Sequence, residues 1–130
     1  GWEVAVATTC ASDHATWRNA LPAGSVAEDG VTVHRFPVSP RDPARYELLH
    51  APVLRGTASY ADELEWLAQS VWSADLDRFV ERSSHDLVIL CPYLFGTTVW
   101  GAHAAGDRAV VLPCLHDEPY ARLTTVRRMI

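Results

Sequence analysis

Three short apolar stretches of the chain are each followed by a cluster of polar side chains that contains a cysteine. The stretches are residues 4–7, 87–90 and 109–112. Apolar runs of four to eight residues bounded by turn residues are typical of strands that are buried on both faces. In a parallel sheet the polar clusters would all emerge at the carboxyl edge, where open α/β sheets bind ligands. The pattern therefore predicts a ligand-binding crevice at one edge of a sheet.

A fourth strand is predicted by the alternation of β-branched and polar side chains over residues 31–36, which stops at Pro37. Its polar face places it nearer the edge of the sheet. The preceding segment, residues 12–30, contains three proline or glycine residues and is expected to be a loop. A short helix is expected around residues 44–50, bounded by prolines on both sides.

The clearest helix is expected to begin at Ser59, which forms a capping-box pattern with Asp62 three residues later. Apolar residues then recur at helical spacing as far as Arg82, with a kink expected at Ser73. A helix of small residues is expected to follow the strand at 86–90, capped by Thr97 or Thr98 and ended by Gly106, and a last helix begins near Tyr120. Strands that alternate with helices indicate βαβ units and a mostly parallel sheet.

The composition of the chain limits the kinds of molecule that it is expected to bind and the compartment in which it is expected. The 130 residues are 48% hydrophobic and 21% charged, which is typical of one globular domain. The net charge of −5 argues against a surface for nucleic acid or anionic membrane, which would be basic. Three cysteines without CxxC spacing indicate buried, reduced thiols and a cytoplasmic protein. No stretch approaches the roughly 18 apolar residues of a transmembrane helix.

The most suggestive polar cluster is His116, Asp117 and Glu118, which follows the stretch at 109–112. A histidine at the end of a strand can orient a hydroxyl group or exchange a proton near neutral pH. The neighbouring carboxylates can accept hydrogen bonds from sugar hydroxyls. The alternative interpretation is a polar loop in which Asp117 or Glu118 helps to start the next helix.

The cluster after residues 87–90 contains Tyr93, Gly96 and Thr97, which we include among the candidate substrate-binding residues. The free N–H groups of a helix N-terminus can hold anionic or hydroxylated ligands, and glycine allows a ligand to approach the backbone closely. Simple helix capping is the alternative. There is no GxGxxG or Walker sequence that would indicate a dinucleotide or ATP site.

The first polar cluster contains Asp13, Trp17 and Asn19. An aromatic ring beside a carboxylate and an amide can hold a sugar ring by stacking and hydrogen bonding. Trp17 could equally be a hydrophobic plug under a long loop. The other four tryptophans are expected to be packing residues, and they are Trp2, Trp66, Trp72 and Trp100.

A zinc site is a further alternative, because cysteine and histidine are common zinc ligands and both follow the predicted strands. The candidate ligands are Cys10, His14, Cys91, Cys114 and His116. Their spacing matches no established zinc motif, so we expect no metal and treat a metal-dependent hydrolase as a remote alternative. Nucleophilic catalysis by Cys114 is less favoured still, because no lowered thiol pKa can be argued from the sequence.

The order and spacing of several motifs resemble the N-terminal domain of family 4 retaining glycosyltransferases. The matching segments are residues 1–11, 17–19, 30–37, 86–88 and 110–117. The resemblance implies one half of the GT-B architecture, in which two Rossmann-like halves face each other. The N-terminal half binds the acceptor, and the C-terminal half holds the nucleotide-sugar. By this resemblance His116 matches a histidine of the reaction centre, and Gly96 and Thr97 occupy a ligand-facing loop.

Two departures from that family are expected to matter. Its first strand and glycine-rich loop are not found before Gly1, and its donor-binding domain is not found after Ile130. We therefore expect a Rossmann-like three-layer sandwich, part of a longer enzyme, whose first strand is missing. That strand would lie between residues 4–7 and 86–90, so unpaired edges and self-association are expected there.

The sequence thus favours the acceptor-binding half of an enzyme that moves a sugar from a nucleotide-sugar to a glycan, lipid or small-molecule acceptor. The isolated chain is expected to be inactive and to need no cofactor beyond the nucleotide-sugar co-substrate. The full-length enzyme is expected in the cytoplasm or at the inner membrane face. The alternative is a non-catalytic α/β binding or interaction domain.

Overall fold

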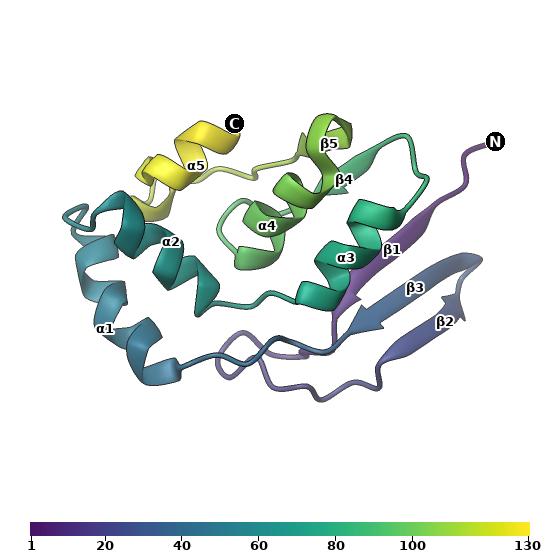
Figure 1. The fold of residues 1–130 in the computed structure, drawn as a ribbon, viewed down its shortest axis with the longest axis horizontal. Helices are drawn as coiled ribbons and strands as arrows, with labels where there is room; N and C mark the ends of the chain where they lie inside the picture. The colour runs from purple at the N-terminus through teal and green to yellow at the C-terminus, as the bar shows by residue number, and fades with distance from the viewer.

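A computed structural model describes residues 1–130 as an α/β domain with two small sheets (Figure 1). The strands are β1 (Ala5–Thr9), β2 (Gly24–Glu28), β3 (Val31–Phe36), β4 (Val88–Leu90) and β5 (Ala109–Val111). The α-helices are α1 (Pro43–Leu54), α2 (Tyr60–Ala68), α3 (Ala74–Arg82), α4 (Gly96–Ala105) and α5 (Thr124–Met129). Two short 3₁₀ helices are η1 (Gly106–Arg108) and η2 (Pro119–Arg122).

The strands form two separate sheets instead of the single sheet that the sequence predicts. The first has the order β1-β3-β2, with β1 parallel to β3 and β2 antiparallel to β3. The second consists of the parallel pair β4 and β5. No pairing joins β1 to β4, so each has one unpaired edge. The α/β class is confirmed, whereas a continuous Rossmann-like sandwich is not.

Strand β2 corrects the prediction that residues 12–30 are a loop. It pairs with β3 through a hairpin whose turn is Asp29 and Gly30, both with positive φ, at 49° and 83°. Two consecutive residues with positive φ are typical of the turn that best matches the twist of a hairpin. All five residues of β2 are exposed, so backbone pairing and not burial holds this strand.

The helix expected over residues 59–82 is divided into α2 and α3. The capping box at the start of α2 is confirmed: Ser59 Oγ accepts the Asp62 N–H at 3.1 Å, and the Asp62 carboxylate accepts the Ser59 N–H at 3.1 Å. Ser73, where a kink was expected, is instead the N-cap of α3. Helix α1 is longer than expected and contains Pro52.

The main core lies among the helices on the left of Figure 1. Its buried residues are Leu49, Val53, Trp66, Leu67, Tyr93, Val99, Leu123 and Val126. A smaller cluster of Leu76, Val80 and Ala105 lies between α3 and α4. The packing role predicted for Trp66 is confirmed, and Trp72 and Trp100 are half-buried. Trp2 is 89% exposed, so the same prediction is wrong for Trp2.

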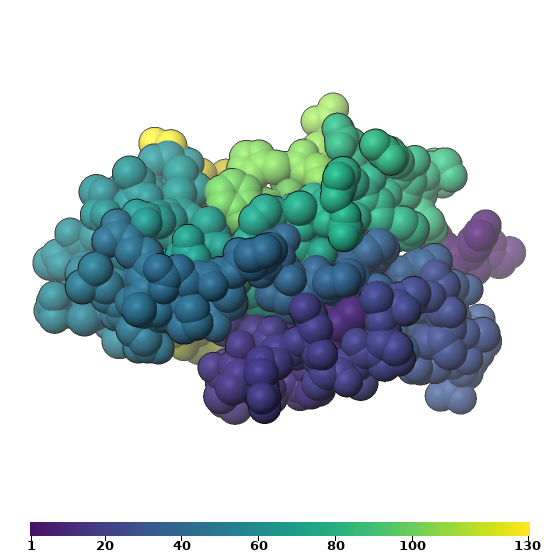
Figure 2. Space-filling model, turned by 60° about the horizontal axis from the view of Figure 1, so that its bottom comes forward, coloured from purple at the N-terminus to yellow at the C-terminus, as the bar shows by residue number.

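Helices α3 and α4 cover only one face of the strands. The opposite face carries exposed apolar side chains from three strands and their ends, namely Val4, Val6, Leu87, Ile89, Val110 and Leu112. In the space-filling view the first sheet and the loop between β1 and β2, in purple and blue, lie below the green helices (Figure 2). The uncovered face is why the three-layer arrangement is not confirmed.

The side chain of Arg108 forms hydrogen bonds with α3, with α4 and with the turn before β4. The Arg108 guanidinium donates to the carbonyl oxygens of Val80 and Ser83, at 2.8 Å each, and to that of His85 at 3.2 Å. Its Nε donates to the carbonyl oxygen of Ala105 at 3.2 Å. The ends of α3 and α4 are thus fastened to the turn that leads into β4. None of the helices is both long enough and apolar enough to cross a membrane.

Candidate functional site

The polar loops that follow β4 and β5 leave the same sheet edge, as the sequence predicts. These strands are parallel, and the Leu112 N–H donates to the Leu90 carbonyl at 2.8 Å just beyond them. The loop after β1 belongs to the other sheet, but it reaches the β4 loop through Trp17, whose ring centroid lies 6.4 Å from that of Phe95. The three loops therefore meet, although not at the edge of one continuous sheet.

A buried tyrosine fixes the two loops of the β4–β5 sheet to each other. Tyr93 is fully buried, its hydroxyl donates to a carboxylate oxygen of Glu118, and its N–H donates to the Pro113 carbonyl. Burial, together with the hydrogen bond to Glu118, raises the pKa of Tyr93 above its ordinary value. Tyr93 therefore acts as a neutral hydrogen-bond donor that orients Glu118.

The other two residues of the acidic cluster face solvent. His116 is exposed, and its carbonyl accepts the Glu118 N–H at 2.9 Å, which gives the loop a tight turn. Asp117 is also exposed and forms an ion pair with Arg122 at 2.7 Å. The side chains of His116 and Asp117 are thus accessible to a ligand, although one Asp117 oxygen already accepts from Arg122. Glu118 accepts the Tyr93 hydroxyl and is less exposed.

Gly96 is placed by packing. It is buried, and its N–H donates to Ser70 Oγ at 2.9 Å. A side chain at this position would lie 2.7 Å from the Leu67 carbonyl oxygen, so only glycine fits against α2. The Thr97 N–H likewise donates to the Val71 carbonyl at 3.0 Å. Neither N–H is free for a ligand, and the N-cap of α4 is Phe95, not Thr97 or Thr98 as expected.

Asp13 and Asn19 hold their own loop together. The Asp13 carboxylate accepts the N–H groups of Ala15 and Thr16, at 2.9 and 2.7 Å, and also the Thr16 hydroxyl. These hydrogen bonds, that from the Thr16 N–H first, lower the pKa of Asp13. Asn19 Oδ1 accepts the Val38 N–H at 2.7 Å. Both side chains are exposed, but their acceptor oxygens already have partners.

Trp17 fills the space under this loop. It is buried and lies edge-on to Tyr46, with ring centroids 5.2 Å apart. The Arg41 guanidinium lies 4.7 Å from its ring centroid, and Arg41 Nε donates to the Gln69 carbonyl at 2.8 Å. The plug interpretation of Trp17 therefore matches its surroundings. The sequence did not indicate Arg41 or Tyr46, because they come from the next segment and only the fold brings them to this loop.

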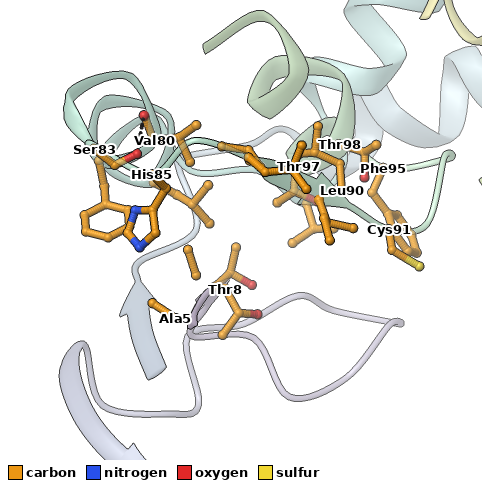
Figure 3. Close-up of a pocket in the computed structure, with 18 residues that line it drawn as sticks. Ala5, Thr8, Val80, Ser83, His85, Leu90, Cys91, Phe95, Thr97 and Thr98 are labelled. Atoms are coloured by element: carbon orange, nitrogen blue, oxygen red, sulfur yellow. Dashed lines mark hydrogen bonds between the residues drawn. The ribbon is translucent and has the colours of Figure 1, made fainter. Parts of the chain in front are cut away.

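A groove of about 360 Å³ separates the unpaired edges of β1 and β4. Figure 3 shows Ala5 and Thr8 on one side of it, and Leu90, Thr97 and Thr98 on the other. Helix α3 closes one side with Leu76, Phe79 and Val80. No aspartate, glutamate, lysine or arginine lines the groove. Most of the residues that line the groove are hydrophobic, and the sequence motifs did not indicate it.

The cysteines do not share one environment. Cys10 is 1% exposed, whereas Cys91 and Cys114 are both exposed, so the prediction of buried thiols is wrong for these two. No group of three or more His, Cys, Asp or Glu side chains is arranged to hold a metal ion. The five candidate zinc ligands therefore do not form a cluster.

Comparison of the chain with models of protein families, with curated proteins and with solved structures finds no match. The functional argument therefore rests on the residues and on their arrangement. Two regions of the molecule support a function. The first is the loop with the accessible His116 and Asp117, beside the Tyr93–Glu118 hydrogen bond. The second is the groove between β1 and β4.

Proposed function

We propose that the chain is the acceptor-binding half of a glycosyltransferase that uses a nucleotide-sugar. The supporting observation is the loop after β5, in which accessible His116 and Asp117 are held beside the carboxyl end of β4 by the hydrogen bond from the buried Tyr93 to Glu118. The order of the sequence motifs, which resembles that of family 4 retaining glycosyltransferases, points to the same function. The donor would be held by another domain.

In this proposal each residue has a limited role. His116 contacts an acceptor hydroxyl through its imidazole, which can donate or accept a hydrogen bond near neutral pH. Asp117 accepts a hydrogen bond from a second hydroxyl of the sugar through the carboxylate oxygen that does not bind Arg122. Tyr93 and Glu118 position the loop. Trp17, Gly96, Asp13 and Asn19 shape the surrounding loops without contacting the sugar, because their rings or polar groups are already engaged.

The proposal is tested by titrating the ¹⁵N-labelled chain with glucose, mannose, N-acetylglucosamine and inositol, and separately with a UDP-sugar. We expect at least one acceptor sugar to shift the amide signals of residues 114–118. Substitution His116→Ala should weaken that binding about fivefold, because one hydrogen bond contributes about 1 kcal/mol. The UDP-sugar should bind weakly or not at all.

The matched control is His103→Ala, which removes another exposed histidine from the far end of α4. This variant should bind the same sugar as tightly as the unchanged chain. Equal weakening by both substitutions would contradict the role of His116. No response to any sugar, or micromolar binding of the UDP-sugar, would overturn the proposal.

A second candidate function, a non-catalytic binding domain, is favoured by the groove. In Figure 1 strands β1 and β4 run in the same direction, and neither has a partner on the side that faces the other. A single extended segment between them could form backbone hydrogen bonds with both edges, as in strand addition to a sheet. Because no aspartate, glutamate, lysine or arginine lines the groove and most of its lining residues are hydrophobic, the segment that fits is apolar and uncharged.

The residues that line the groove limit the size of the side chains that such a segment can have. The groove is lined by small residues of β1, namely Ala5, Ala7, Thr8 and Thr9, together with Leu76 and Phe79 of α3. We therefore expect small side chains on the face that meets α3 and larger apolar ones on the opposite face. That opposite face would extend the exposed apolar surface that includes Val6 and Ile89.

The probe is a capped peptide of alternating valine and alanine with a lysine at each end for solubility. Its matched control has the same side chains but carries N-methyl groups on alternate residues, which removes the backbone donors. Binding of the first peptide should slow amide exchange in β1 and β4 by tenfold or more, since these edges become paired. Equal binding of the methylated peptide, or no binding of either, would overturn this second candidate.

A further inference from the structure

Two cysteines lie side by side at the carboxyl end of the β4–β5 sheet. Cys91 follows β4 directly, and Cys114 lies three residues beyond the end of β5. Their Sγ atoms are 3.7 Å apart, and both side chains are exposed. The only other cysteine, Cys10, is buried after β1. The pair is thus set apart from Cys10 both by accessibility and by proximity.

Backbone hydrogen bonds keep these two positions in register. The Leu112 N–H donates to the Leu90 carbonyl at 2.8 Å, on the strand side of the pair. The Tyr93 N–H donates to the Pro113 carbonyl at 3.4 Å, on the loop side. The two thiols are therefore held together by the sheet itself and do not meet through the chance motion of two free loops.

Little movement separates the two thiols from bond formation. A disulfide bond is about 2.05 Å long, so the sulfur atoms must approach each other by about 1.6 Å. Rotation of the side chains about their Cα–Cβ bonds can supply this movement. Cys114 also lies in an exposed loop, and its backbone has a φ of 50°. Because Cys114 is exposed, core packing does not hold its side chain in place.

We propose that Cys91 and Cys114 form a reversible disulfide by exchange with a small disulfide such as oxidised glutathione. In the first step one cysteine thiolate attacks a glutathione sulfur, forms a mixed disulfide and releases one reduced glutathione. In the second step the other cysteine attacks the protein sulfur of the mixed disulfide and releases a second glutathione. The two thiol protons and two electrons of the cysteines pass to the two glutathione molecules.

The hydrogen bond between the two thiols affects the reactivity of Cys91 in the reduced pair. Its hydrogen bond with the Cys114 thiol, and after that burial, raises the pKa of Cys91 above its ordinary value. Because the thiolate is the attacking species, Cys91 is a poor first nucleophile in the reduced pair. Whichever cysteine attacks glutathione first, the other lies 3.7 Å away and closes the ring.

The disulfide would tie the start of the β4 loop to the loop that carries His116. Tyr93 already connects the same two loops through Glu118. Oxidation adds a covalent link beside this hydrogen bond and reduces the freedom of residues 114–118. The pair thus gives the loop two states, a reduced one held by hydrogen bonds and an oxidised one held by a covalent bond.

The test uses the whole chain equilibrated with mixtures of oxidised and reduced glutathione, followed by alkylation and trypsin digestion without reductant. Cleavage after Arg82, Arg108 and Arg122 places Cys91 in peptide 83–108 and Cys114 in peptide 109–122. We expect these two peptides to be joined, with a loss of two hydrogens. Cys10, on a peptide of its own, should remain free.

Three variants make the result specific. Cys91→Ser and Cys114→Ser should each abolish the joined peptide, and Cys10→Ser should leave it unchanged. Oxidation should raise the melting temperature by about 10 °C, because closing a loop of this length restricts the unfolded chain, and dithiothreitol should reverse the rise. Only mixed disulfides with glutathione at Cys91 or Cys114, or a joined peptide that contains Cys10, would overturn the proposal.

Discussion

At the helical end of the molecule, α1, α2 and α5 enclose Trp66, Leu67 and Val126, each no more than 1% exposed. At the strand end, Val6 and Ile89 are 43% and 59% exposed, although they belong to strands as apolar as any in the chain. Parallel strands normally have both faces covered. The comparison indicates that the helical end contributes most of the stability of the chain, whereas the strand end leaves apolar side chains exposed.

The two ends also differ in whether a buried carboxylate oxygen has hydrogen-bond partners. At the helical end Glu63 is buried and accepts the N–H groups of Thr124 and Thr125, at 3.1 and 2.9 Å, which caps α5 from a neighbouring helix. At the strand end Asp77 of α3 has a buried carboxylate oxygen without a partner. Burial raises the pKa of Asp77 to about 6. The Glu63 carboxylate therefore stabilises the fold through its hydrogen bonds, whereas the Asp77 carboxylate lowers the stability of the fold when it is charged.

The largest expected effect contrasts the two apolar surfaces. Trp66→Ala should lower the free energy of unfolding by about 4 kcal/mol, because it empties a site stacked between Tyr46 and Tyr120. Ile89→Ala should cost less than about 1 kcal/mol, since most of that side chain is exposed. Urea unfolding followed by circular dichroism measures both. Losses of equal size would contradict the assignment of stability to the helical end.

A smaller effect is expected when the cap of α5 is removed. Glu63→Ala should lower the free energy of unfolding by about 2–3 kcal/mol, because two backbone N–H groups and the Thr125 hydroxyl lose their acceptor. The matched control is Glu81→Ala, an exposed position on α3, which should change stability by less than about 0.5 kcal/mol. If both variants unfolded at the same urea concentration, the capping role of Glu63 would be wrong.

The smallest expected effect is an increase in stability, which we expect when Asp77 is replaced by asparagine. Below pH 3.8, the ordinary pKa of Asp77, the group is protonated in both the folded and unfolded chain and costs nothing. Between about pH 4 and about pH 6 the unfolded chain loses the proton first, so stability falls, and the full cost is present above pH 6. Asp77→Asn should therefore stabilise the chain at pH 7 by about 1–2 kcal/mol, a figure reduced because the group is only half-buried.

The measurement is a series of urea unfolding curves for both proteins between pH 3.5 and pH 7.5. The two curves of stability against pH should coincide at the acid end and diverge above pH 4. A constant difference across the whole range would show that the effect of the substitution does not come from ionisation of Asp77.

Local signals predicted the fold where neighbouring residues decide it. Ser59 and Asp62 form the capping box within four residues, and the left-handed conformation of Gly106 ends α4. Strand β2 was missed because none of its residues is buried and its sequence has no hydrophobic period. The Asp29-Gly30 pair was the available signal, since this dipeptide favours a two-residue hairpin turn.

The candidate site was less accessible to prediction, because distant residues determine it. Gly96 has the sequence signature of a ligand-binding turn, but the Leu67 carbonyl explains why it must be glycine. Trp17 is buried by Tyr46 and Phe95, which only the fold brings to it. The partnership of Cys91 with Cys114 depends in the same way on the register of β4 and β5.

The hydrogen bonds of Arg108 affect how the strand end of the molecule unfolds locally. Its acceptors at Val80, His85 and Ala105 belong to three separate segments, the end of α3, the turn before β4 and the end of α4. An opening of any one segment breaks the hydrogen bonds of the same guanidinium. These segments therefore open as one cooperative unit, and their backbone amides should exchange with solvent deuterium through a shared opening event.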